Sequence, residues 1–278
     1  MRPSAYPWSR AVWTSAIALA TAAGSLMLGP QPDAGEVPGA VTGAMVISLA
    51  TLPLLVKGRI PERWLPGGRL WITAAKWSRL ILLPLLLMAL MAPPGTVRDV
   101  AGVHRWLLPS PGAWPSLGLT ALGVGLWCLM QWRFRPPRLF RMLGRSRRVS
   151  LVLTESAQHI LHNGVPEEFY YRLLLQSWLV QHLPWPLLGV LASALLFGLV
   201  HLLWAGPRSR LHALLDAVLV QAPLGLMLGC AWLSSTWLPG VAALHAAIDT
   251  VVTLDQGAAQ ALARRARRKA QGPKEVRV

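Results

Sequence analysis

The chain has 278 residues, of which 54% are hydrophobic and only 14% are charged. This composition, with a mean hydropathy of +0.44, is that of a membrane protein. The two cysteines, Cys128 and Cys230, both lie inside apolar runs, which excludes a disulfide framework and a thiolate zinc site.

Apolar runs of about 18 to 22 residues recur along the chain, and each is long enough to cross a hydrocarbon core of roughly 30 Å as a helix. Helices are expected because lipid offers the backbone no other hydrogen-bond partner. The sequence therefore predicts an all-α fold, a polytopic transmembrane helix bundle of about eight spans. The first run can also be read as a signal peptide. The expected spans are approximately residues 11–28, 40–56, 70–92, 116–132, 160–181, 186–204, 212–233 and 237–254.

The net charge of +16 is concentrated in alternate connections between these spans. Basic residues crowd the segments 57–69, 133–148, 208–210 and 264–277, whereas the connections between them are poor in base. An excess of lysine and arginine marks cytoplasmic loops, so both termini are expected in the cytoplasm. The basic residues are expected to face anionic lipid, and no nucleic acid partner is expected.

The N-terminal part, residues 1–150, is expected to be a transmembrane scaffold of about four spans without catalytic residues. Lys76 and Arg79 lie within its third span, and both are expected to snorkel toward the cytoplasmic face. Asp216, near the inner end of the seventh span, is expected to be an interfacial acid beside the basic connection that precedes it, although it can also line a cavity.

The candidate chemistry begins after residue 150. Residues 151–163 are predicted to form a helix that Gly164 and Pro166 interrupt. The helix fits either an amphipathic interfacial element, which is the preferred reading, or a metal site. Three of its polar side chains share one face at helical spacing, namely Glu155, His159 and His162.

The stretch from Gly164 to Arg172 places two adjacent carboxylates and an arginine at the start of an apolar run. A charge at the centre of a membrane helix costs roughly 2.5 to 3.5 kcal/mol, so it is kept mainly when it is paired, hydrated or functional. Glu168 and Arg172 are four residues apart in the favourable order for an ion pair that supports the helix. Glu167 points about 100° away and lacks a local partner. It is read as a functional carboxylate or, alternatively, as a cap at a helix N-terminus.

Ionisable side chains recur at a similar depth in two later spans. His201 lies near the inner end of the sixth span, one turn after Phe197, and His245 lies near the middle of the eighth, with Asp249 one turn deeper. Glu167 is also in the inner half of the membrane. A lone histidine in an apolar helix is usually a packing residue, but three helices with ionisable groups at one depth favour a shared site.

Three strings follow one another on successive predicted membrane helices: Glu167-Glu168-x-x-x-Arg172, Phe197-x-x-x-His201 and His245-x-x-x-Asp249. Together they resemble the motifs of the CPBP family of intramembrane proteases, which includes the type II CAAX prenyl endopeptidases and bacteriocin-processing or immunity-associated proteins. The resemblance covers residues 151–256. The chain departs from the family pattern at Asp249, where the family often has asparagine.

The resemblance implies a role for each of these residues. Glu167 would activate a water for attack on a peptide carbonyl, and His201 would position or deprotonate that water. His245 and Asp249 would face the oxyanion, where hydrogen-bond donors are needed. Asp249 would therefore be protonated, or would orient a positively charged His245. Glu168 and Arg172 would be the supporting pair.

No cofactor is preferred, and metal-free catalysis by Glu167 is the expected mechanism. Zinc is the alternative, because Glu167, His201 and His245 would make a three-ligand set with an open fourth position. Against zinc, no helix carries an HExxH pattern, and the two histidines come from separate helices.

The expected function is that of a membrane-embedded endopeptidase that cuts a membrane-presented protein or peptide near the cytoplasmic face. The chain is expected to contain the N-terminal scaffold, a catalytic membrane core at 151–256 and a basic cytoplasmic tail at 257–278. Its expected place is a bacterial inner membrane, and its expected partners are the substrate and the bilayer. Two alternatives from other classes are a proton-coupled transporter and a non-catalytic scaffold or immunity protein.

Overall fold

The computed structural model describes residues 7–28, 69–91, 107–134, 145–204 and 209–270. Within these ranges all the regular secondary structure is helical, which confirms the predicted all-α class. The predicted span 40–56 lies outside the described residues, as do the greater parts of the basic segments 57–69 and 133–148 and the end of the basic tail.

The helices follow one another in chain order. They are α1 (Trp8–Leu28), α3 (Arg69–Trp77), α4 (Leu83–Met91), α7 (Trp114–Phe134), α9 (Arg145–His159), α10 (Val165–Glu168), α11 (Ser177–His182), α12 (Pro186–Val200), α13 (Arg210–Asp216), α14 (Ala222–Ser235) and α15 (Leu238–Ala270). Within the described residues, π-helical segments join consecutive α-helices without a break: η2 (Ser78–Leu82), η3 (Ile160–Gly164), η4 (Phe169–Gln176) and η6 (Ala217–Gln221). A 3₁₀ turn, η5 (His201–Trp204), follows α12.

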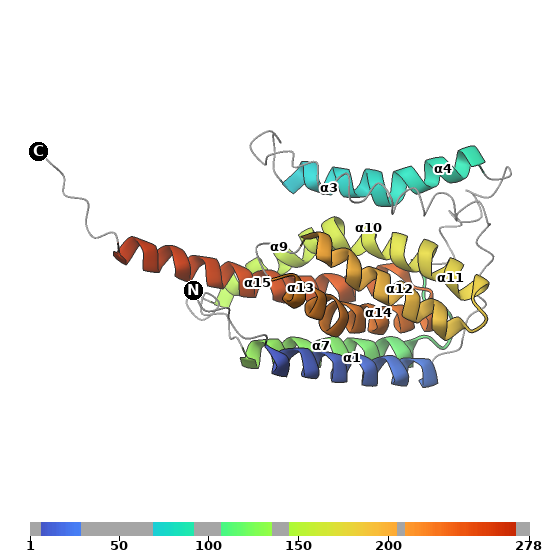
Figure 1. Ribbon diagram of the computed structural model, residues 1–278, viewed down its shortest axis with the longest axis horizontal. Coiled ribbons are helices and arrows are strands. Elements are labelled where there is room, and N and C mark those ends of the chain that lie inside the picture. The colour runs from blue at the N-terminus through green and yellow to red at the C-terminus, as the bar shows by residue number, and fades with distance from the viewer. Residues whose placement is uncertain (1–6, 29–68, 92–106, 135–144, 205–208, 271–278) are drawn as a thin grey trace, which may run out of the picture.

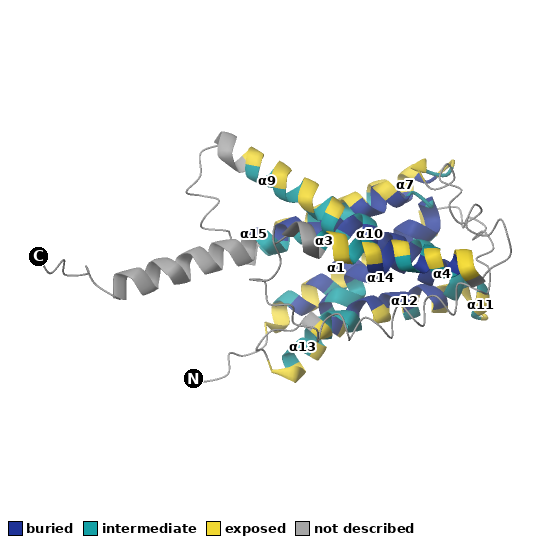
Figure 2. Ribbon diagram, turned by 90° about the horizontal axis from the view of Figure 1, so that it is seen from above, coloured by how far each residue is buried: buried dark blue, intermediate teal, exposed yellow. Residues whose placement is uncertain are grey.

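Helix α14 lies at the centre of the bundle. Every residue from Leu224 to Ser235 is buried, and α1, α7, α12 and α15 pack around this helix. Figure 1 shows α1 and α7 side by side along one face, with α3 and α4 along the opposite face. Buried residues face the centre of the bundle, whereas exposed residues lie on the outer sides of α4, α7 and α9 (Figure 2).

Hydrogen bonds between small polar side chains hold the N-terminal helices in the bundle. Ser25 of α1 and Thr120 of α7 share a hydrogen bond of 2.9 Å, and the Trp127 indole donates to Thr14 at 3.0 Å. All four side chains are buried. Such bonds stabilise helix association where surrounding lipid is as apolar as the side chains themselves.

Several helical stretches are long and apolar enough to cross a membrane. In the described residues these are Trp8–Leu28, Thr73–Leu90, Pro186–Leu203 and Arg210–Ser235, and Leu238–Leu254 is a shorter apolar helix. Large apolar side chains such as Leu90, which is 73% exposed, cover their outer faces. Lipid accommodates such a surface, so the chain is an integral membrane protein. The number of about eight spans and the placement of both termini stay predictions.

Residues 145–182 form one continuous helix made of α9, η3, α10, η4 and α11. The expectation that Gly164 and Pro166 interrupt it is wrong. Gly164 keeps helical dihedral angles, with φ −52° and ψ −63°. The Val165 N–H donates to Ile160 O, five residues back, so the turn before Pro166 is wider than an α-turn. This wider turn accommodates a residue that has no N–H to donate and whose ring would crowd the preceding turn.

Gly164 is also the point where this long helix meets α15. A Cβ atom at position 164 would lie 2.6 Å from the backbone oxygen of Ala242. That distance is shorter than a van der Waals contact, so only glycine permits the observed spacing between the two helices. The residues on either side of this contact, Asn163 and Glu167 on one helix and His245 on the other, are the polar ones discussed below.

We expect Gly164→Ala to destabilise the protein by about 1 to 3 kcal/mol, because the added methyl group must push a backbone aside. The midpoint of thermal unfolding in detergent measures the effect. Gly118→Ala is the matched control, since a Cβ at that position meets nothing within 4 Å. Equal unfolding midpoints for the two variants would contradict the close packing at Gly164.

Candidate functional site

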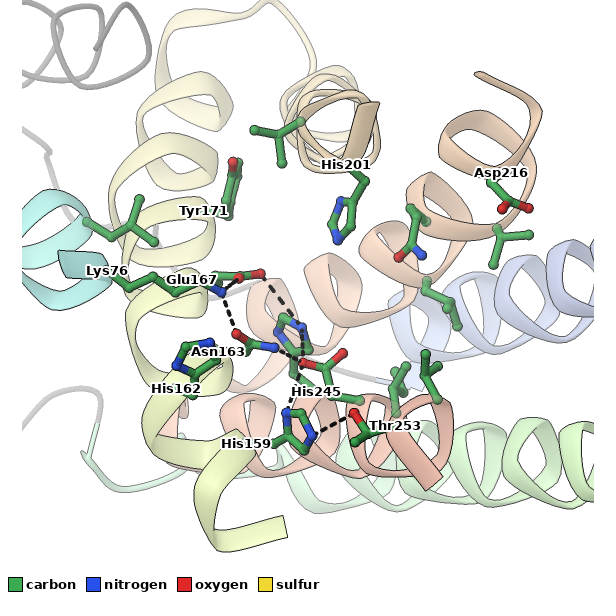
Figure 3. Close-up of a pocket in the computed structure, with 18 of the residues that line it drawn as sticks. Lys76, His159, His162, Asn163, Glu167, Tyr171, His201, Asp216, His245 and Thr253 are labelled. Atoms are coloured by element: carbon green, nitrogen blue, oxygen red, sulfur yellow. Dashed lines mark hydrogen bonds and ion pairs between the residues drawn. The ribbon is translucent and has the colours of Figure 1, made fainter. Parts of the chain in front are cut away.

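A cavity of about 410 Å³ lies among the helices that carry the predicted site residues (Figure 3). Side chains from α3, η2, the long helix, α13 and α15 reach it, together with His201 of η5. Its ionisable and amide-bearing lining includes Lys76, Arg79, His159, His162, Asn163, Glu167, His201, Asp216, His245 and Asp249. A polar cavity of this size can hold several water molecules and part of a substrate.

The four residues predicted to carry the chemistry all line this cavity. Glu167 reaches it from α10, His201 from η5, and His245 and Asp249 from α15. The sequence predicts that ionisable side chains from three helices share a site, and in the structure these side chains line one cavity. Asp216 lines the same cavity from α13, as the alternative reading of this residue predicted.

Glu167 has a partner that sequence reasoning missed. Lys76 Nζ of α3 lies 2.6 Å from Glu167 Oε1 and also donates to Asn163 Oδ1. The expectation that Lys76 and Arg79 snorkel to the membrane surface is wrong: Lys76 binds these two acceptors, and Arg79 is only 8% exposed. A carboxylate within hydrogen-bond reach gives the Lys76 ammonium a partner inside the bundle.

Asn163 links two parts of the cavity. Its Oδ1 accepts from Lys76, and its Nδ2 donates to Asp249 Oδ2. Asn163 precedes Glu167 by one helical turn, so both side chains emerge on the same side of the long helix. That spacing was the signal in the sequence that could have identified it.

The pair predicted to support the helix is present and fully buried. Arg172 Nε donates to Glu168 Oε2 at 2.8 Å, and both side chains are 0% exposed. Arg172 Nη1 also donates to Gln176 Oε1, at 3.3 Å, and Gln176 Nε2 donates to Gly229 O of α14 at 2.8 Å. A buried carboxylate is stable only with such partners, since removing one of them typically costs 3 to 5 kcal/mol.

His245 is held from both sides of its ring. The His245 Nδ1–H donates a hydrogen bond to Glu168 Oε1, with 2.6 Å between the two atoms. Nε2 faces the cavity, 3.8 Å from Glu167 Oε2 and 3.7 Å from Asp249 Oδ2. The Phe197 ring meets the imidazole edge to face, with the ring centres 5.6 Å apart. His245 therefore has one orientation, and its free nitrogen points at the two cavity carboxylates.

His201 approaches the cavity from the end of α12. Its Nδ1 donates to Phe197 O at 2.8 Å, a bond to the carbonyl one turn earlier. With the proton on Nδ1, the neutral ring presents the lone pair of Nε2. Figure 3 shows the ring pointing into the cavity from the side opposite His245.

The polar stripe before Gly164 is used for contacts between helices. His159 Nε2 lies 2.9 Å from Thr253 Oγ1 of α15, and His162 Nδ1 lies 2.7 Å from Thr73 Oγ1 of α3. The two imidazoles bind different neighbours, so the metal reading of this stripe is not supported. In the described part of the chain, no three His, Cys, Asp or Glu side chains form a group suited to a metal ion.

Comparison with protein families gives a match to part of the chain. Searches of curated proteins and of solved structures found nothing similar to the chain. Residues 150–251 match the model of the family described as type II CAAX prenyl endopeptidase Rce1-like. This segment holds Glu167, His201, His245 and Asp249, whereas Lys76 lies outside it. Residues 150–251 are therefore similar to the Rce1-like type II CAAX prenyl endopeptidase domain.

Proposed function

We propose that the protein is an intramembrane endopeptidase that hydrolyses a peptide bond in a membrane-presented protein or peptide near the cytoplasmic face. One observation carries the proposal: a carboxylate, Glu167, lines a polar cavity together with the imidazoles of His201 and His245, inside an Rce1-like domain. Peptide hydrolysis needs a base, a water and donors for the oxyanion, and this set of side chains can supply them.

Glu167 is the general base in this proposal. Lys76 engages its Oε1, which leaves Oε2 as the oxygen directed toward the cavity and toward His245. A water held between Oε2 and the His201 Nε2 lone pair loses a proton to Glu167 as its oxygen attacks the peptide carbonyl. The protonated Glu167 then donates that proton to the leaving amine, so the carboxylate is regenerated.

His245 is the donor for the oxyanion. Glu168 accepts the Nδ1 proton, and two further carboxylates, Glu167 and Asp249, lie near Nε2. Three carboxylates around one ring favour the doubly protonated imidazolium, because a neutral ring would turn a lone pair toward two of them. The imidazolium Nε2–H is then available to the developing negative charge, where one such donor contributes about 10² to 10³ in rate.

Asp249 orients His245 in this mechanism. Asn163 donates its amide hydrogen to Asp249 Oδ2, so that oxygen acts as an acceptor. An acceptor oxygen 3.7 Å from Nε2 fits a carboxylate that attracts the imidazolium better than it fits a neutral acid that contacts the oxyanion. The structural contacts thus favour the second of the two roles that the sequence left open for this residue.

Zinc fits the cavity less well than metal-free chemistry. The ligand set would be Glu167, His201 and His245, but the Lys76 ammonium already lies 2.6 Å from Glu167 Oε1. A cation bound at that carboxylate would be repelled by the ammonium unless Lys76 moved. The donors needed for the reaction are available from the protein itself.

We expect Glu167→Gln to abolish processing, because the amide keeps the shape of the side chain but cannot accept the proton from water. The loss should be at least about 10²-fold, the lower bound for general-base catalysis. Comparison of protein termini in membranes from cells with the wild-type or variant protein should show shortened termini only with the wild type. Glu155→Gln, the same change on the same helix, is the control and should process normally. Unchanged termini patterns between wild type and Glu167→Gln would contradict the mechanism.

We also expect the purified protein to stay active after exhaustive chelation, with metal analysis confirming removal. The reason is the ammonium at Glu167, which fills the place of a cation at this carboxylate. Cleavage of the substrate found by the terminal comparison is the measurement. Activity lost on chelation and restored by zinc would establish the metal mechanism instead.

A further inference from the structure

The third predicted span contributes a side chain to the site, although it lies outside the Rce1-like domain. Lys76 is on α3, and residues 150–251 form the matched segment. Its ammonium is 2.6 Å from Glu167 Oε1 and is also bonded to Asn163 Oδ1. In Figure 3 Lys76 extends from α3 to the carboxylate and the amide. We propose that Lys76 is a positioning residue that keeps Glu167 ionised and directs its second oxygen into the cavity.

The first argument is electrostatic. The side chains of Lys76 and Glu167 are 14% and 15% exposed, so bulk water reaches neither of them fully. A carboxylate in such a place is ionised only if a charge or donor stabilises it, and otherwise it takes up a proton. A protonated Glu167 cannot act as a base. Within the described residues, Lys76 is the group that hydrogen-bonds to this carboxylate.

Other charged and titratable groups around the cavity act on Glu167 from a greater distance. Arg10 and Arg79 are cations, and the proposed His245 imidazolium lies 3.8 Å from Glu167 Oε2, so these groups also attract the carboxylate, but Lys76 is the cation that is hydrogen-bonded to it at 2.6 Å. Neutral imidazoles, the acids and the phenol do not stabilise its charge. Lys76 therefore supplies a stabilisation that these groups do not replace in full. The groups are Arg10 on α1, Arg79 on η2, His159, His162 and Tyr171 on the long helix, His201 on η5, Asp216 on α13, and His245 and Asp249 on α15.

The second argument is geometric. An ammonium has three donors, and here Glu167 and Asn163 receive two of them. The bond to Asn163 Oδ1 fixes the amide so that its Nδ2 points to Asp249. Lys76 thus sets the orientation of the base and, through Asn163, of the acid beside His245. Misplacement of reacting groups by about 1 Å can cost 10²-fold in rate.

The inference rests on the proposed function, but its first test needs no substrate. The infrared C=O band of a protonated carboxyl group reports the ionisation of this side chain, and its absence from the double variant Lys76→Met/Glu167→Gln assigns it to Glu167. In purified protein at neutral pH we expect the band in Lys76→Met, and its absence from wild type and Lys76→Arg. Absence of the band from Lys76→Met would overturn the electrostatic role, whatever reaction the protein catalyses.

The second test is kinetic and uses the substrate found by the terminal comparison. We expect Lys76→Met to lower kcat by about 10²-fold with KM within about twofold, since the base and not substrate binding is affected. Lys76→Arg should recover at least a tenth of the wild-type kcat. A merely structural role predicts loss of thermal stability without this recovery. Wild-type kcat in Lys76→Met would overturn the proposal.

A chemical rescue separates the charge from the fold. Lys76→Cys should be as slow as Lys76→Met, and treatment with bromoethylamine should restore kcat by rebuilding an amine of nearly the same length. Wild-type protein treated in parallel controls for the native Cys128 and Cys230. Alkylation at position 76, verified by mass spectrometry, without any recovery of kcat would count against the positioning role. Cleavage by Glu167→Gln would instead refute the proposed function and leave the infrared result standing.

Discussion

The hydrogen bond between Glu168 and His245 is the interaction on which the rest of the site depends. Glu168 Oε1 accepts from His245 at 2.6 Å, while Oε2 accepts from Arg172 at 2.8 Å, so both oxygens of one buried carboxylate are engaged. The first bond joins α10 to α15, and the second neutralises the charge within one helix. Without Arg172 the carboxylate would be costly to bury, and without Glu168 the His245 ring would lose its fixed orientation. These bonds therefore fix the side of the cavity that His245 lines.

Local spacing predicted a good part of this arrangement. Glu168 and Arg172 are four residues apart, and an ion pair at that separation needs no knowledge of the fold. The positions of His201 and His245 within their predicted spans also predicted that they lie near Glu167. Helices that cross the same bilayer bring residues of equal depth to the same level. The matched family segment agrees with the resemblance drawn from the three motifs. These arguments predict which residues line the cavity, but they do not predict the hydrogen bonds that each residue makes.

Contacts between distant helices could not be predicted in the same way. Lys76 and Glu167 are 91 positions apart, and no spacing rule connects them. An isolated base in an apolar run is itself a reason to expect an intramembrane acid as its partner, and that reasoning would have found the pair. Glycine and proline usually end helices, so the sequence predicts a break at Gly164 and Pro166. In the structure a π-turn lets the long helix continue through both residues.

The contact of Gly164 with the backbone of Ala242 has a consequence for how the site responds to sequence change. The long helix carries Glu167, α15 carries His245, and the absence of a side chain at position 164 sets how closely these two helices approach. Position 164 thus acts as a spacer of fixed thickness between acid and imidazole. Gly164 does not line the cavity, yet a larger residue there would move apart the two helices that hold Glu167 Oε2 and His245 Nε2 at 3.8 Å.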